Sequence, residues 1–282
     1  AIEAWAPYAG YPRAVCFHQN RLWWAGTEYE PNKLWASMLG DFQNYRLSSN
    51  DDGGMAFAIA SDDMQEIVWI ASLNGLVIGT TTSEWTARQA DGQNSITPTN
   101  PPFFKQESAN GSADVAPVRV GESIVFVDRY RRRVRRLFYD ANAGGYLASD
   151  LTGLAEHVTG TGITSPCLQK RPEPVLWCVK DDGGMASLTL VPEQNVFAWA
   201  THANTQCSFE SVASVNGPDG EELWAITHYQ NGDRDIQRAD IGTLNRTSGT
   251  TTSVHMDYNV RKSAVSPFTT ITIPAILIGR TL

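Results

Sequence analysis

Residues 22–25 read Leu22-Trp23-Trp24-Ala25, a short run of apolar and aromatic residues typical of a buried β-strand. Four later runs have the same character: Val68-Trp69-Ile70-Ala71, Ile124-Val125-Phe126-Val127, Leu176-Trp177-Cys178-Val179 and Leu223-Trp224-Ala225-Ile226. Their central residues, Trp23, Trp69, Phe126, Trp177 and Trp224, lie 46, 57, 51 and 47 positions apart. A period of about 50 residues indicates one supersecondary unit that is used repeatedly.

The sequence between these runs predicts further strands. They are Lys33–Ser37, Phe42–Leu47, Leu76–Thr81, Glu84–Ala87, Ser187–Val191 and Val196–Trp199. Turn dipeptides occur at Asn74-Gly75, Asp91-Gly92, Asp219-Gly220 and Asn231-Gly232. Three or four strands per unit is the layout of a propeller blade, and packing around a ring protects the strand edges. We therefore expect an all-β, β-propeller-like fold of about five to six blades, each with three to four antiparallel strands.

The domain organisation follows from the extent of this pattern. We assign residues 1–253 to the propeller-like domain. Residues 254–282 are strand-like but lack Trp, so we expect C-terminal strands that close the propeller or lead into a missing domain. Helix is predicted only at Asp150–His157, with Asp150 as N-cap and Gly153 as a weak point. The stretch Asp51–Ala56 recurs as Asp181–Ala186, and its spacing of 130 residues suggests different turns within the two blades.

Composition and charge restrict the class of protein. The chain has 282 residues with nine Trp, nine Tyr and ten Phe, which favours many short strands over helices. Its net charge of −8 argues against adhesion to nucleic acid or to an anionic membrane. No apolar run is long enough to span a bilayer, so we expect no membrane anchor. Four widely spaced cysteines favour free thiols and folding in a reducing cytoplasm, and the start at Ala1 without Met suggests a trimmed or fragmentary chain.

A basic run between residues 129 and 136 is the most conspicuous charge feature. It contains six arginines with an interleaved tyrosine: Arg129, Arg131, Arg132, Arg133, Arg135 and Arg136, with Tyr130. One interpretation is a hairpin whose arginines are solvated, with alternate residues on opposite faces. Another is a subunit interface with an acidic neighbouring copy, and a third is a contact with DNA phosphates. We take the subunit interface as the candidate functional site.

Signatures of catalysis or cofactor binding are missing from the sequence. The acidic pairs Asp51-Asp52, Asp62-Asp63 and Asp181-Asp182 do not extend into a calcium-binding pattern, so we interpret them as turns. The five histidines are scattered, and no nucleophile elbow or phosphate-binding loop occurs. A pair of catalytic carboxylates for glycoside hydrolysis is an open alternative, because the sequence does not give the distance between two carboxylates in the fold. We expect no enzyme, no metal and no cofactor.

Several segments, taken in order, resemble a known family. They are Pro12–Gly26, Leu34–Ser37 with Gly40-Asp41-Phe42, Val125–Arg129 with Arg133–Arg136, Ser149–Thr152, Pro174–Val179, Glu193–Trp199 with His202, Glu210–Ala213 and Leu223-Trp224. Together they resemble the nozzle protein of short-tailed bacteriophages, also called tail tubular protein B, and related phage tail structural proteins. The resemblance runs from about residue 5 to residue 240. Thr227-His228-Tyr229 and Gln206-Cys207-Ser208 depart from the family pattern.

The resemblance implies a structural role in the virion tail, assembled in the host cytoplasm. Its members form a homo-oligomeric ring, usually a hexamer, at the distal end of the tail, through which the genome leaves the capsid. The implied partners are a tail adaptor protein above the ring and a tail fibre or spike at its side. Genomic DNA would pass transiently without specific binding, and an acidic chain suits a conduit that must not hold DNA.

Two other functions remain open on the sequence. One is a carbohydrate-binding or carbohydrate-active propeller, in which exposed aromatic rings stack on sugars. The other is an adhesion or scaffold propeller from a cell that holds a partner on one face. Polysaccharide-binding assays and the genome neighbourhood would separate these functions from a tail protein.

Overall fold

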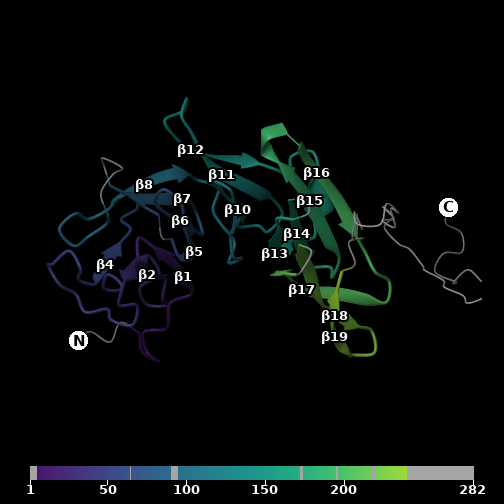
Figure 1. Cartoon of the computed structure of the whole chain (residues 1–282), viewed down its shortest axis with the longest axis horizontal. Coiled ribbons are helices and arrows are strands. Elements are labelled where there is room, and N and C mark those ends of the chain that lie inside the picture. Colours follow the sequence, from purple (N-terminus) through teal and green to yellow (C-terminus); the bar gives the residue numbers. More distant parts are fainter. Residues whose placement is uncertain are drawn as a thin grey trace, which may run out of the picture. The chain divides into compact units, whose positions relative to one another are not determined.

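The computed structural model describes residues 5–63, 65–89, 95–171, 174–194, 196–217 and 220–239. In these residues the protein consists of five antiparallel β-sheets that follow one another along the chain (Figure 1). Four of these sheets have four strands and the last has three. The predicted all-β, propeller-like fold with three to four strands per blade is therefore confirmed.

Every strand pairs with its neighbour in sequence, so strand order within a sheet follows the chain. The first sheet contains β1 (Ala14–His18), β2 (Arg21–Ala25), β3 (Lys33–Ala36) and β4 (Met55–Ala58). The second contains β5 (Ile67–Ser72), β6 (Leu76–Thr80), β7 (Glu84–Arg88) and β8 (Phe103–Ser108). The third contains β9 (Val118–Val120), β10 (Ser123–Val127), β11 (Val134–Asp140) and β12 (Gly145–Asp150).

The last two sheets are joined to the third by a short helical segment. After α1 (Glu156–Thr159), the fourth sheet contains β13 (Ile163–Gln169), β14 (Val175–Lys180), β15 (Met185–Val191) and β16 (Val196–His202). A 3₁₀ turn, η1 (Pro192–Gln194), lies between its last two strands. The fifth sheet contains β17 (Cys207–Asn216), β18 (Glu221–Tyr229) and β19 (Arg234–Arg238).

The repeated aromatic runs do not all occupy the same strand of their sheet. In the first, third, fourth and fifth sheets the run lies on the second strand, namely β2, β10, β14 and β18. In the second sheet it lies on the first strand, β5, one strand earlier. This displacement explains why Trp69 follows Trp23 after a short interval and precedes Phe126 by a long one.

Each pair of successive sheets encloses its own hydrophobic core. Trp23, which is 1% exposed, belongs to the first core, between the first and second sheets. In the second core the rings of Trp69 and Phe126 lie 5.6 Å apart. Leu176 and Leu188 belong to the third core, and Leu223 to the fourth. Among the described residues no core joins the first sheet to the last, so each sheet is stabilised by its sequence neighbours.

The prediction of a strand at Phe42–Leu47 is wrong. These residues form turns and irregular backbone, and the fourth strand of the sheet is β4, which begins at Met55. Turn hydrogen bonds reverse the chain here, because the Asn44 amide donates to the Asp41 carbonyl at 3.3 Å. The Tyr45 hydroxyl then accepts a 2.7 Å hydrogen bond from Trp24 Nε1. The segment therefore covers the aromatic outer face of the sheet instead of pairing with it.

The predicted helix at Asp150–His157 is also misplaced. The helix α1 covers only Glu156–Thr159, and Ala155 at its N-cap makes no side-chain cap. Asp150 ends β12, where its Oδ1 accepts hydrogen bonds from the Thr152 amide at 2.8 Å and the Thr152 hydroxyl at 2.6 Å. The carboxylate thus stabilises a turn that precedes the helix by several residues.

The two copies of the repeated stretch lie at different turns, as predicted. Asp51–Gly54 precedes β4, the fourth strand of its sheet, whereas Asp181–Gly184 joins β14 to β15. The turns at Gly75 and Gly232 connect β5 to β6 and β18 to β19. The expected turn at Asp91-Gly92, the residue Asp219, the expected domain boundary at residue 253 and the expected C-terminal strands of 254–282 lie outside the described residues. Within the described ranges, no helix is long and apolar enough to cross a membrane.

Candidate functional site

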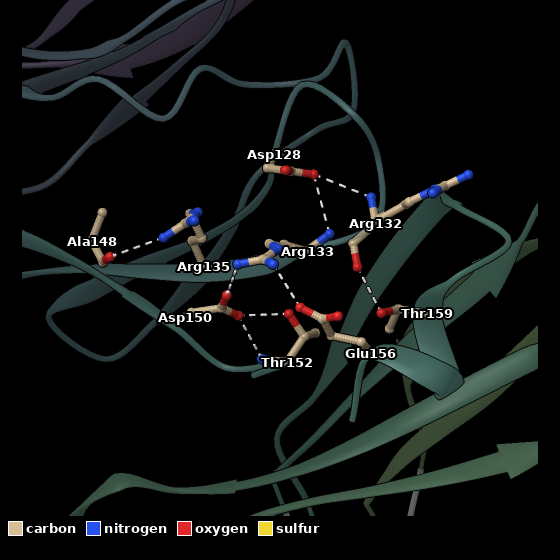
Figure 2. A network of polar contacts seen from close by, with 9 residues as sticks. All are labelled: Asp128, Arg132, Arg133, Arg135, Ala148, Asp150, Thr152, Glu156 and Thr159. Atoms are coloured by element: carbon tan, nitrogen blue, oxygen red, sulfur yellow. Dashed lines mark hydrogen bonds and ion pairs between the residues drawn. The ribbon is translucent and has the colours of Figure 1, made fainter. Parts of the chain in front are cut away.

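The basic run forms the turn between β10 and β11, with its last two arginines on β11. The turn is held by Asp128, a buried residue whose Oδ1 accepts hydrogen bonds from the amides of Arg132 and Arg133 at 3.1 Å each (Figure 2). Arg131 adopts the left-handed backbone region with φ of 63°, which reverses the chain. Arg129, Arg132 and Arg133 are exposed, whereas Arg131, Arg135 and Arg136 are partly buried.

Two of the turn arginines make ion pairs within the same chain. The Arg133 guanidinium donates to Asp150 Oδ2 at 3.0 Å and to Glu156 Oε1 at 2.6 Å (Figure 2). Arg131 lies 3.4 Å from Asp181 Oδ1 and donates from Nε to the Ile163 carbonyl at 3.1 Å. These partly exposed pairs contribute little stability individually, but they connect the turn to β12, α1 and the fourth sheet.

Arg135 and Arg136 lie on β11, and both are half-buried. Arg135 donates to the Ala148 carbonyl at 3.4 Å, and its buried Nε has no hydrogen-bond partner within the described residues. Arg136 donates from Nε to the Ser123 hydroxyl at 3.0 Å and stacks over the Phe138 ring at 4.8 Å. Burial lowers the pKa of Arg136, while the charge of Glu193 raises it. Both side chains therefore belong to the packing of the third sheet.

The remaining two arginines are presented to solvent. Arg129 is exposed and lies over the ring of its neighbour Tyr130 at 4.9 Å. The Arg132 side chain extends away from the acidic residues of the network, and among the described residues it contacts no carboxylate (Figure 2). Of the six arginines predicted at a subunit interface, Arg129 and Arg132 are thus the two whose side chains make neither an ion pair nor a hydrogen bond within the described residues.

An apolar hollow lies beside this turn, and sequence reasoning did not find it. It has a volume of about 520 Å³ and is lined by the segment 149–158 together with Phe197 and Trp199 of β16. Trp199 Nε1 donates to the Leu151 carbonyl at 2.8 Å, which joins the two walls. Leu154 is fully exposed at its rim. The signal in the sequence is the uncharged run Val196–Thr201, of which Val196–Trp199 predicts a strand but no cavity.

Buried ionisable groups elsewhere have structural partners. Glu84 on β7 is fully buried and accepts hydrogen bonds from the hydroxyls of Ser112, at 2.8 Å, and Ser108. Burial raises the pKa of Glu84, and these hydroxyl contacts partly oppose the rise. His18 on β1 is hydrogen-bonded through Nδ1 to the Ser72 hydroxyl at 2.8 Å, and burial lowers its pKa to about 4. Neither group is accessible to a substrate.

The acidic pairs and the cysteines lie in separate places. Asp182 accepts a hydrogen bond from the Gly184 amide at 2.9 Å and so stabilises its own turn, whereas Asp51 accepts one from the Thr99 hydroxyl and joins two separate loops. The described residues contain no group of three or more His, Cys, Asp or Glu placed to hold a metal ion. All four cysteines are free, and burial raises the pKa of Cys16 and of Cys178 to about 12. The fifth histidine, His255, lies outside the described residues.

Comparisons with known proteins concern the fold alone. No protein-family model and no curated protein sequence matches the chain. A protein from Lactobacillus plantarum superposes with a TM-score of 0.50 and 10% sequence identity, over 82% of this chain and 71% of that one. The β-propeller domain of Cps50 (Swd1) from Myceliophteria thermophila matches 80% of this chain and 72% of its own, with a TM-score of 0.47 and 10% identity. A chain of a nidogen/laminin complex matches with a TM-score of 0.42 and 11% identity, covering 81% of this chain and 80% of that chain.

Proposed function

We propose that this chain is a structural component of a bacteriophage tail, a nozzle or tail tubular protein that forms a homo-oligomeric ring through which the genome is ejected. The observation that carries the proposal is the ordered series of family-like segments. In the fold these segments build successive parts of the sheets: Pro12–Gly26 contains the β1–β2 hairpin, and Glu193–Trp199 contains the first four residues of β16. A repeated β-architecture with a predominantly structural use of its ionisable groups suits a building part of a larger assembly.

Charge supports the proposed passage of DNA. The chain has 30 acidic and 22 basic residues, and four of the six arginines in its basic run are tied to partners within the chain. A ring built from such subunits repels phosphates and would let DNA slide without specific binding. The proposed partners are further copies of the chain, a tail adaptor protein and a tail fibre or spike, within the virion tail. We propose no enzymatic activity.

Native mass spectrometry and negative-stain electron microscopy test this proposal. The protein is expressed in its complete native reading frame, because flanking sequence contributes to ring assembly in the proposed family. We expect closed rings, with a hexamer as the main species, and no retention of duplex DNA in a mobility-shift assay at physiological salt. A protein that stays monomeric at every concentration, or that binds duplex DNA tightly, would refute the proposal.

The hollow beside β16 favours carbohydrate binding as a second candidate function. It combines two aromatic side chains, Phe197 and Trp199, with the polar residues Ser149, Asp150 and His157. Aromatic rings beside hydrogen-bonding groups are the usual components of a sugar site. A polysaccharide array decides between the functions. Saturable retention that is lost in the Phe197→Ala variant would favour carbohydrate binding, whereas no retention is expected of a nozzle protein.

A further inference from the structure

The outer edge of the fourth sheet is a long strand without charged side chains. β16 is the last strand of that sheet and runs for seven residues, Val196 to His202. Most of its residues are exposed, including Phe197 at 38%. Proteins commonly protect such edges with charges, proline or a covering segment, because an open apolar edge recruits another strand. The edge of β16 has no charged side chain or proline to protect it, and it is therefore a candidate site for pairing with another strand.

The hydrogen bonds of the neighbouring strand β15 establish which backbone groups of β16 face outward. The Leu190 amide donates to the Pro174 carbonyl at 3.0 Å, and so Leu190 of β15 pairs toward β14. Since backbone groups alternate between the two sides of an antiparallel strand, Thr189 pairs toward β16. Thr189 lies opposite Ala198, so Ala198 turns its amide and carbonyl inward.

The same alternation applies along the rest of β16. Inward pairing falls on the even-numbered residues, which leaves the amides and carbonyls of Phe197, Trp199 and Thr201 directed to the open edge. No hydrogen bond to these backbone groups from another described element is found. The outward amides and carbonyls of these three alternate residues can form hydrogen bonds with the backbone of one added strand.

The surroundings of β16 fit a second copy of this chain. The hollow of about 520 Å³ beside the strand can receive an apolar side chain, and Leu154 at its rim offers another contact. The chain carries a net charge of −8, so acidic surfaces of two copies repel one another. A strand without charged side chains is where two such copies can approach.

Other outer strands of the described sheets are less suited to this contact. β19 carries Arg234, Asp235 and Arg238, and β8 carries Lys105 and Glu107. β12 ends at the charged Asp150, and the remaining uncharged outer strand, β4, is only four residues long. Short or charged edges resist pairing with another chain.

We infer that β16 pairs edge to edge with a strand of a second copy of this chain, and that the hollow beside it receives an apolar side chain of that copy. The inference deepens the proposed function and rests on its requirement for self-association. It assigns the contact to the open edge of β16.

Two variants test the edge without altering the core. Phe197→Lys places a charge on the exposed edge, and Thr201→Pro removes an outward amide while leaving the inward pairing to β15 unchanged. Phe103→Lys is the matched control, because Phe103 is a 60% exposed aromatic residue on another outer strand, β8. Sedimentation velocity on the complete protein measures association, and circular dichroism verifies that each variant folds. We expect the two edge variants to weaken self-association by at least about tenfold and the control to leave it unchanged.

Hydrogen exchange gives a second, local measurement on the wild type. Amides of residues 196–202 should become more protected as protein concentration rises, while those of β8 stay constant. If the wild type assembles but neither edge variant weakens assembly, the β16 contact is refuted and the proposed ring stands. If the wild type never self-associates, both are refuted. An assembly that depends on β16 but stops at two copies would keep the contact and refute the ring.

Discussion

At the scale of single residues, His18 determines how stability depends on pH. Burial lowers its pKa from 6.5 to about 4, so between these values the unfolded chain binds a proton that the folded chain does not. The contribution of His18 to the free energy of unfolding should therefore be largest above pH 6.5 and should fall by about 3 kcal/mol as the pH drops to 4. Urea unfolding at a series of pH values measures this dependence.

The His18→Asn variant isolates the contribution of this residue. Asparagine has no titration in this range and retains a polar atom near the position of Nδ1, which contacts Ser72 in the wild type. The difference in unfolding free energy between the two proteins should narrow as the pH falls from 6.5 to 4, because only the wild type loses the His18 contribution. If the unfolding free energies of the wild type and the variant changed in parallel with pH, His18 would not be held neutral in the fold.

At the scale of elements, the turn between β10 and β11 depends on one carboxylate. Asp128 accepts the amides of both Arg132 and Arg133, so Asp128→Ala leaves two donors without this acceptor. We expect a loss of about 1–2 kcal/mol in the free energy of unfolding, measured by urea denaturation at neutral pH. Arg132→Ala is the control, since its exposed side chain has no carboxylate partner in the described residues and should change stability by less than about 0.5 kcal/mol. Equal effects of the two substitutions would contradict this account of the turn.

Elements that are buried on both faces were predictable from sequence, and irregular ones were not. β10 and β14 lie at runs whose apolar character reflects burial between neighbouring sheets. The segment Phe42–Leu47 also contains aromatic residues, yet a strand needs a partner edge as well, and the turn at Asp41 directs the chain elsewhere. Arg21 shows the same limit, because its buried guanidinium donates to the carbonyls of Ser37 and Gly53, and Gly53 lies 32 residues away. Contacts between residues so far apart in the sequence cannot be predicted from local strand propensity.

The candidate site was predictable in position but not in its pairing. The basic run was evident in the sequence, whereas the partners of Arg133 and Arg131 come from β12, α1 and the turn after β14. The hollow depends on a contact between Leu151 and Trp199, which are 48 residues apart. Whether a cation is used internally or remains free for another molecule is thus decided by tertiary packing.

At the scale of the whole molecule, stability should decrease toward the fifth sheet. Counted over the described residues, the fourth core has five buried residues in its cluster, whereas the third core has thirteen. Because each sheet packs on its sequence neighbours, the fifth sheet can open while the others stay folded. Hydrogen exchange followed by mass spectrometry should therefore show faster exchange in β17 and β18 than in β10 and β11. Leu223→Ala should increase exchange in the fifth sheet by about thirtyfold or more, with little change in the third sheet.

A matched truncation in the third core distinguishes local opening from global unfolding. Leu176 is as completely buried as Leu223, but it lies between two sheets that each pack on further neighbours. Leu176→Ala should therefore raise exchange on both sides of its core, in β10, β13 and β14, because opening there separates the two larger parts of the series. If both substitutions accelerated exchange equally in every sheet, the five sheets would unfold as one cooperative unit and their sequential packing would not govern stability.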